Sequence, residues 1–327
     1  MNLHTHQLTR RKVMTRFSLL FAIMSVGFLI SGRVAVLPQT PPQTREIISD
    51  AFTKHRRQGT STHVSAKNSQ RQNLNGTQSK AKKPRAYRLA YSTVANPAAV
   101  NHRVAQLGIT VWKLRPVTVS DKGATILVRD EGTASEWVPE RVHSDTKFRE
   151  GDYVRLSIES PKTGYLYIVN RDIFADGSVG EAKLIYPWKG MRVGDNLVRP
   201  GRIVDIPAQE DNPGYFTARP RQSKQAGELL TFIVSRAPLD LPVSDQRLPM
   251  SRAQLGRWEK LWGSQAERFE MDGGVGEIWT TQEQQASLRL RARQLTRDDP
   301  APQTIYRAAP SNRQAFLVNL KLAYQQE

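Results

Sequence analysis

The sequence contains no cysteine. This absence excludes a disulfide, a metal site with thiolate ligands and a cysteine nucleophile. It does not fix the compartment, because a domain of this size does not depend on disulfides for stability. Histidine is also scarce, and His143 is the only histidine after Val104. A serine hydrolase triad needs a base of this kind, so this part of the chain offers a single candidate.

Catalytic and metal-binding patterns are equally sparse. The candidate base stands in His143-Ser144-Asp145, where three polar neighbours are typical of a loop rather than of a preorganised triad. The carboxylates of Glu270 and Asp272 are loosely spaced for glycoside hydrolysis. Phosphate-binding loops of the types G-x-x-x-x-G-K-[ST] and G-x-G-x-x-G do not occur. We therefore expect a non-enzyme with no catalytic residue, no cofactor and no metal site.

Acidic residues are nearly absent from the first third of the chain. Residues 1–103 hold 17 of the 48 lysines and arginines but only two acids, Glu46 and Asp50. The rest of the chain holds 31 basic and 28 acidic residues. A nucleic-acid-binding fold carries its positive charge on the domain itself. Because the charge after residue 103 is almost balanced, we expect no nucleic-acid partner.

A long apolar run occurs near the N terminus. Basic residues 9–16 precede the apolar residues 17–30, which is the order found in signal peptides. This run is short for a standard spanning helix, but an extension to Leu37 would allow it to stay as an anchor. We expect export to the periplasm or a similar extracytoplasmic compartment. Residues 1–37 are then a signal peptide, or residues 17–37 anchor the chain in the inner membrane; the general and twin-arginine routes both stay open.

Residues 38–103 have the composition of a basic linker. Apolar positions are few, so little surface is available to offset the entropy of an ordered chain. We predict a largely disordered segment with two open roles. It is a solvated tether, or it is a polycation that contacts anionic lipid or a wall polymer.

Residues 148–207 show the two-residue period of β-strands. Along residues 153–159, Val154, Leu156 and Ile158 share one face, and Arg155, Ser157 and Glu159 share the other. Turn residues such as Asp176-Gly177 separate the apolar runs. We predict an antiparallel meander with one buried face. Gly164 follows a turn cluster, so we expect a positive φ there.

Further alternating segments surround this meander. We therefore predict a mainly β domain over residues 104–327, either an antiparallel β-sandwich or a Greek-key barrel. Helical spacing of apolar residues predicts two C-terminal helices, at 251–269 and 280–295, in an extension over 250–297. Alternation predicts a closing strand at 314–324.

Residues 148–238 contain several different short motifs. They are Gly151-Asp152, 164–172, Asp176-Gly177, 184–187, Gly194-Asp195-Asn196, Pro200-Gly201, Ile206-Pro207 and 227–229. In combination they resemble the bacterial family known as domain of unknown function 4384. The resemblance implies an exported or multidomain β module without assigned catalysis, joined in some relatives to a protein kinase or a caspase-like peptidase. This chain carries neither of those signatures.

These observations lead to a first functional hypothesis. We expect an exported, non-enzymatic β-sandwich module that contacts a protein or an envelope polymer. Two alternatives stay open: an accessory domain or degenerate hydrolase acting on envelope carbohydrate, and a peripheral protein that binds a lipid surface through its basic tail. Aromatic and arginine side chains suit partner contacts. The candidate contact residues are Arg171, Asp176, Trp188, Lys189 and Arg192.

Overall fold

The computed structural model describes most of the chain after residue 103 and one short segment before it. The described residues are 49–58, 104–130, 133–187, 196–241, 248–271, 273–288, 293–310 and 314–325. All of them belong to one compact unit, Thr40–Glu327.

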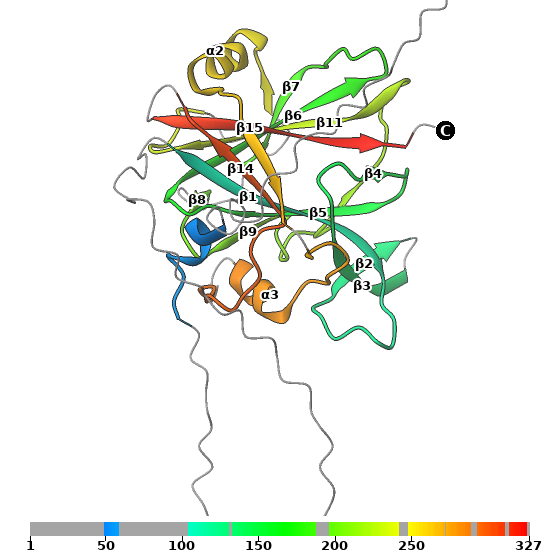
Figure 1. Cartoon of the computed structure of the whole chain (residues 1–327). Coiled ribbons are helices and arrows are strands. Elements are labelled where there is room, and N and C mark those ends of the chain that lie inside the picture. Colours follow the sequence, from blue (N-terminus) through cyan, green and yellow to red (C-terminus); the bar gives the residue numbers. More distant parts are fainter. Residues whose placement is uncertain are drawn as a thin grey trace, which may run out of the picture. The chain divides into compact units, whose positions relative to one another are not determined.

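The strands of these described ranges form two sheets (Figure 1). The first sheet contains β1 (Ala105–Pro116), β2 (Ile126–Asp130), β3 (Thr133–Val142), β5 (Tyr153–Glu159), β9 (Ile203–Ile206), β10 (Phe216–Thr217), β13 (Glu267–Glu270) and β14 (Thr304–Ala308). The second contains β4 (Lys147–Phe148), β6 (Gly164–Phe174), β7 (Ala182–Tyr186), β8 (Leu197–Val198), β11 (Gln225–Ser235), β12 (Leu248–Met250) and β15 (Ala315–Tyr324). The helices are α2 (Arg252–Trp262) and α3 (Thr281–Ser287).

The two sheets share one apolar core. Leu156 and Ile158 of β5 enter it from the first sheet, as their alternation predicted. Ile168 of β6, Phe232 of β11 and Val318 of β15 enter it from the second sheet. A mainly β chain whose two sheets bury a common apolar layer is consistent with a β-sandwich.

Helix α2 covers part of the outer face of the second sheet. Leu255 and Trp262 of the helix pack with Val169 of β6 and Ile233 of β11. Ser251 caps the helix, because its side chain accepts a hydrogen bond from a backbone N–H of the first turn. The apolar stripe of α2 therefore faces the sheet.

The predicted extents of the helices are wrong. Helix α2 ends at Trp262 rather than at 269, and Phe269 instead lies in β13, opposite Ile305 of β14. Helix α3 starts behind a capping box at Thr280 but ends at Ser287, because Leu288 has an extended backbone. The segment expected to be a helical extension thus contains a strand between two shorter helices.

The outer face of the first sheet is also buried. Arg155, Ser157 and Glu159 of β5 are at most 7% exposed. The prediction of one buried face is therefore wrong for β5. The reason is that α3 and its flanking loops fold over this face, together with residues 49–58 (Figure 1).

Residues 49–58 fall within the linker that composition predicts for 38–103, but they are folded. Residues 49–53 are helical, and Phe52 packs with Phe269 and Ile305. Arg56 reaches the first sheet and pairs with Glu159. This segment is thus part of the folded unit, while the other residues of the predicted linker before 104 lie outside the described residues.

Gly164 is required for a reason other than the one predicted. Its φ does not lie in the positive range. A Cβ at this position would lie 2.7 Å from Val234 Cγ1 and 2.9 Å from the carbonyl oxygen of Ser235. The close approach of β6 to β11 therefore needs a residue without a side chain.

The described part of the chain contains no helix that is long and apolar enough to cross a membrane. The apolar run 17–30 lies outside the described residues. Export and membrane anchoring stay predictions.

Candidate functional site

Six charged side chains are buried on the outer face of the first sheet. We call them the outer-face cluster: Arg56, Arg141, Arg155, Glu159, Asp205 and Glu283. They form three ion pairs. Arg56 Nη2 lies 2.6 Å from Glu159 Oε2, Arg155 Nη2 lies 2.8 Å from Asp205 Oδ2, and Arg141 pairs with Glu283. Positive and negative charges are therefore balanced within the cluster.

Neutral groups complete the outer-face cluster. Ser157 Oγ donates to Asp205 Oδ1 over 2.5 Å and accepts from Trp112 Nε1 over 2.7 Å. The Arg155 guanidinium lies over the ring of Trp279, 4.7 Å from its centroid. Burial raises the pKa of Asp205 and lowers that of Arg155, and the attraction between the two opposes both shifts. This arrangement is typical of a structural network, because each buried charge has an opposite partner.

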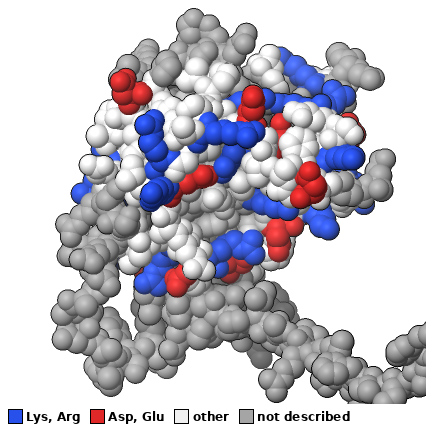
Figure 2. Space-filling model, turned by 90° about the horizontal axis from the view of Figure 1, so that it is seen from above, with Lys and Arg blue, Asp and Glu red and all other residues white. Residues whose placement is uncertain are grey.

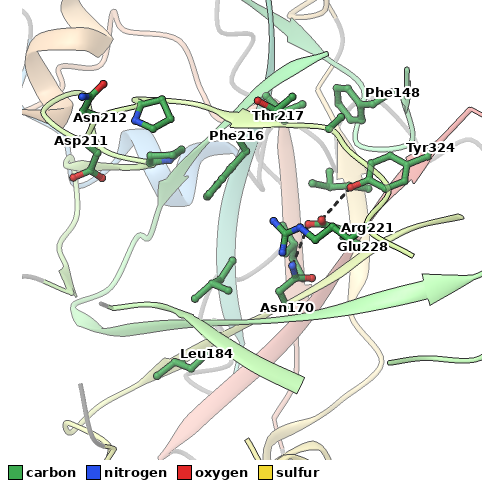
Figure 3. Close-up of a pocket in the computed structure, with 17 residues that line it drawn as sticks. Phe148, Asn170, Leu184, Asp211, Asn212, Phe216, Thr217, Arg221, Glu228 and Tyr324 are labelled. Carbon is green, nitrogen blue, oxygen red and sulfur yellow. Dashed lines mark hydrogen bonds between the residues drawn. The ribbon is translucent and has the colours of Figure 1, made fainter. Parts of the chain in front are cut away.

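A second polar cluster lies inside the two-sheet core. There a cavity of about 420 Å³ opens where the apolar core ends (Figure 3). We call it the inter-sheet cavity. Both sheets line it: β5 and β10 contribute from the first sheet, and β4, β6, β7, β11 and β15 from the second. Most walls are apolar, with Phe148, Leu184, Pro213, Phe216, Leu230 and Leu322 among them.

Three neighbouring strands place polar side chains in the inter-sheet cavity (Figure 3). Glu228 of β11 accepts a hydrogen bond from Tyr324 Oη of β15 over 3.0 Å. Its other oxygen accepts from Asn170 Nδ2 of β6 over 3.1 Å. Asn170 is only 6% exposed, and its Oδ1 atom has no hydrogen-bond partner among the described residues. We call Asn170 and Glu228 the acceptor wall.

The surroundings of Glu228 disfavour the charged form of its carboxyl group. Burial raises its pKa above the ordinary value, and the hydrogen bond from Tyr324 and the charge of Arg221 only partly oppose this shift. Arg221 is an exposed residue of the loop before β11, and Figure 3 shows it beside Glu228. Within the described residues the two form no ion pair. The same surroundings raise the pKa of Tyr324.

The chemistry of the inter-sheet cavity suits binding. Its size and its mixture of apolar walls with a few convergent polar groups are usual for ligand sites. Carboxylate and amide oxygens accept hydrogen bonds, so a bound group has to supply donors. A carboxyl with a raised pKa in a cavity also marks candidate sites.

The tripeptide at His143 has a different geometry from a triad. Ser144 is buried, and its hydroxyl donates a short hydrogen bond to Glu270. His143 Nδ1 lies 3.8 Å from the same carboxylate. Thr304 Oγ1 also donates to Glu270, over 3.0 Å. The serine hydroxyl is thus bound to a carboxylate and not to the imidazole.

Of the five residues proposed from the sequence as a contact surface, the structure describes two, Arg171 and Asp176. Arg171 donates to Glu259 of α2 over 2.7 Å and to Thr231 over 3.1 Å, so it is used within the fold. Asp176 is exposed at the β6–β7 turn, where it accepts from the backbone of Ser178. Trp188, Lys189 and Arg192 lie outside the described residues.

Sequence reasoning missed the acceptor wall. Its members follow the inward parity of their strands: Asn170 continues the row of Leu166 and Ile168, and Glu228 precedes Leu230. A polar residue in an inward row of each of two paired strands is a signal for an internal polar site. This signal is present in the sequence.

No group of three or more metal-ligating side chains occurs in the parts of the chain that the structure describes. Figure 2 shows acidic and basic residues intermixed on the face in view. This pattern on one face matches the nearly balanced charge of the sequence after residue 103.

Residues 147–236 match a protein family model described as Domain of unknown function (DUF4384). The resemblance recognised from the motifs is thereby confirmed, with almost the same bounds. Asn170 and Glu228 lie inside the matched segment, whereas Tyr324 and Leu322 complete the cavity from outside it. No curated protein and no solved structure matched the chain.

Proposed function

We propose that residues 104–327 form a non-enzymatic β-sandwich module that binds its partner through the inter-sheet cavity. The acceptor wall supports this proposal most directly. Buried polar atoms in folded proteins nearly always have a partner. Among the described residues Asn170 Oδ1 has none, and Asn170 is one of the residues that line the inter-sheet cavity. The missing donor is supplied, in this proposal, by a bound molecule.

The size of the inter-sheet cavity limits what enters it. A volume of about 420 Å³ suits a compact small molecule or a large side chain of a protein partner. The apolar walls contribute affinity by removing apolar surface from water. The few polar groups orient the molecule. This mode of binding agrees with a module that contacts a protein or an envelope component.

We also propose that the domain acts outside the cytoplasm. The support is the order of basic residues 9–16 and apolar residues 17–30, because positive charge next to an apolar segment resists translocation. A reporter with compartment-dependent activity, fused after Glu327, tests this part separately. Cytoplasmic-type reporter activity would contradict export and the envelope partner with it.

The two alternatives have less support than cavity binding. The hydrolase alternative draws on His143, whose neighbour Ser144 is bonded to Glu270 instead. The lipid alternative draws on residues 38–103, of which the structure describes only 49–58. Neither alternative accounts for the acceptor wall.

Ligand-observed NMR on the full-length chain tests cavity binding. A mixed set of small aromatic and aliphatic compounds of both charges is screened against the native protein and Ala218→Leu. Ala218 is a buried wall residue, so the larger side chain reduces the cavity. Ala134→Leu on exposed β3 is the matched control. We expect binders that Ala218→Leu loses and Ala134→Leu keeps. No binders, or equal binding by both variants, would contradict the proposal.

A further inference from the structure

We propose that the acceptor wall holds a cation, namely an organic ammonium or guanidinium group carried on an apolar body. This inference rests on the proposed function, because it names the chemistry of the ligand in the inter-sheet cavity.

The hydrogen-bonding capacity of the acceptor wall is the first argument. In the described part of the chain, both oxygens of Glu228 receive hydrogen bonds from neutral donors only, Tyr324 and Asn170. Asn170 Oδ1 receives none from the same residues. A carboxylate oxygen has room for more than one hydrogen bond. A group with several N–H donors therefore fits Glu228 directly, and it reaches Asn170 Oδ1 once the Asn170 amide rotates toward the cavity.

The charge around the inter-sheet cavity is the second argument. Glu228 and Asp211 line it as carboxylates, and Arg221 is the cation that lines it. Asp172 lies close enough to Glu228 to disfavour its ionised form further. The charge of Asp211 also acts on the buried guanidinium of Arg155, so the negative charge at the acceptor wall comes from Glu228 and Asp172, which would repel an anion. A neutral alcohol could satisfy Asn170, but it would leave the charge of Glu228 uncompensated.

Arg221 is the third argument and supplies the sharpest test. Its exposed side chain acts on Glu228 through space, without an ion pair in the described structure. A bound cation would compete with this guanidinium for the same carboxylate. Removing Arg221 should therefore favour a cationic ligand, whereas it would weaken an anionic one.

Three probes of similar shape distinguish a cationic, a neutral and an anionic ligand on the full-length chain. They are phenethylamine, 2-phenylethanol and phenylacetate. Their affinities are measured by protein-observed NMR titration. We expect phenethylamine to bind best and phenylacetate worst. The capped dipeptide N-acetyl-Phe-Lys-amide is a fourth probe. If it binds more tightly than phenethylamine, the natural source of the cation is a protein side chain; if more weakly, it is a free amine.

Two variants and one control complete the experiment. Glu228→Gln keeps the shape and should weaken phenethylamine by about tenfold or more, with little effect on 2-phenylethanol. Arg221→Ala should strengthen phenethylamine severalfold. Arg219→Ala removes a neighbouring exposed arginine that does not line the cavity, and it should change neither affinity.

Two results overturn the inference in distinguishable ways. If phenylacetate or 2-phenylethanol binds as well as phenethylamine, or Arg221→Ala weakens phenethylamine, the cavity binds ligands but not cations. If none of the probes binds, and the wider screen with Ala218→Leu finds no binder either, the proposed function fails as well.

Discussion

The outer-face cluster contains buried charges and the acceptor wall a half-buried one, and the two regions differ in how these charges are paired. In the outer-face cluster, three arginines and three carboxylates pair within the fold. In the acceptor wall, Glu228 is held by neutral donors and its neighbour Asn170 keeps a free oxygen. Burying a charge costs several kcal/mol unless a partner offsets it. The first region pairs its charges internally, although Arg141 Nε and Arg155 Nη1 have no hydrogen-bond partner among the described residues. In our proposal a ligand provides the partner in the second region.

The largest effect is expected at the outer-face cluster. Arg56→Ala should lower the free energy of unfolding by about 3–5 kcal/mol, because Glu159 is left buried without a cation. Chemical denaturation of the full-length chain measures this loss. Arg57→Ala is the matched control, because Arg57 is the next residue along the chain and its own side chain is exposed. Equal midpoints for Arg56→Ala and the native protein would show that residues 49–58 do not stabilise the domain.

A smaller effect is expected at the neutral centre of the same cluster. Ser157→Ala should lower the free energy of unfolding by about 1–3 kcal/mol. The change leaves Trp112 Nε1 without an acceptor and removes one donor to Asp205. Thermal denaturation together with tryptophan fluorescence follows both consequences. An unaltered Tm would remove Ser157 from the network.

The inter-sheet cavity and the packed cluster around Ala286 of α3 should also differ in their tolerance of added volume. Ala218→Leu extends into the inter-sheet cavity, so its cost should stay below about 1 kcal/mol. Ala286→Leu adds the same atoms in the packed cluster with Ile203 and Leu295, and it should cost about 1–3 kcal/mol. Paired denaturation curves give the comparison. If Ala218→Leu costs more, the cavity has less room than described.

Sequence alone predicted the inner faces of the sheets well. The side chains of Val154, Leu156 and Ile158 fill the core, because alternate side chains of a strand point to the same face of the sheet. The same alternation failed for Arg155 and Glu159, since polar residues on a strand usually face water. Their burial depends on segments far away in the chain, which fold back over β5. No local pattern encodes such a contact.

The candidate site could be predicted only in part. The polar residues Asn170 and Glu228 sit in inward rows, which the strand period makes visible. Their meeting depends on the pairing of β6 with β11, which sequence periodicity does not specify. Tyr324 comes from a strand about a hundred residues away. Helix extents were overestimated because Phe269 fits a helical stripe and a strand face equally well.

The pH dependence of stability should carry the signature of the acceptor wall. The pKa of Glu228 is raised in the folded protein, so the native state binds its proton more tightly than the unfolded state does. The carboxyl therefore lowers stability as pH rises through this raised value, and it has no such effect below the ordinary pKa of about 4.3. Tyr324, Arg221 and Asp172 face the same group. At low pH, Glu228→Gln should have the same free energy of unfolding as the native protein. At higher pH its free energy of unfolding should be larger, by less than the losses predicted for Arg56→Ala and Ser157→Ala.

The most direct test compares the buried Glu159 with the half-buried Glu228. Unfolding free energies of Glu159→Gln and Glu228→Gln are measured at pH 8 under identical conditions. We predict opposite signs. Glu159→Gln should destabilise, because Arg56 loses its anion. Glu228→Gln should stabilise, because an uncompensated charge is removed; the new amide nitrogen donates to Asn170 Oδ1 once the Asn170 amide turns its oxygen in place of Nδ2 toward residue 228. A clear loss of stability in both variants would contradict the account and make Glu228 a structural residue like Glu159.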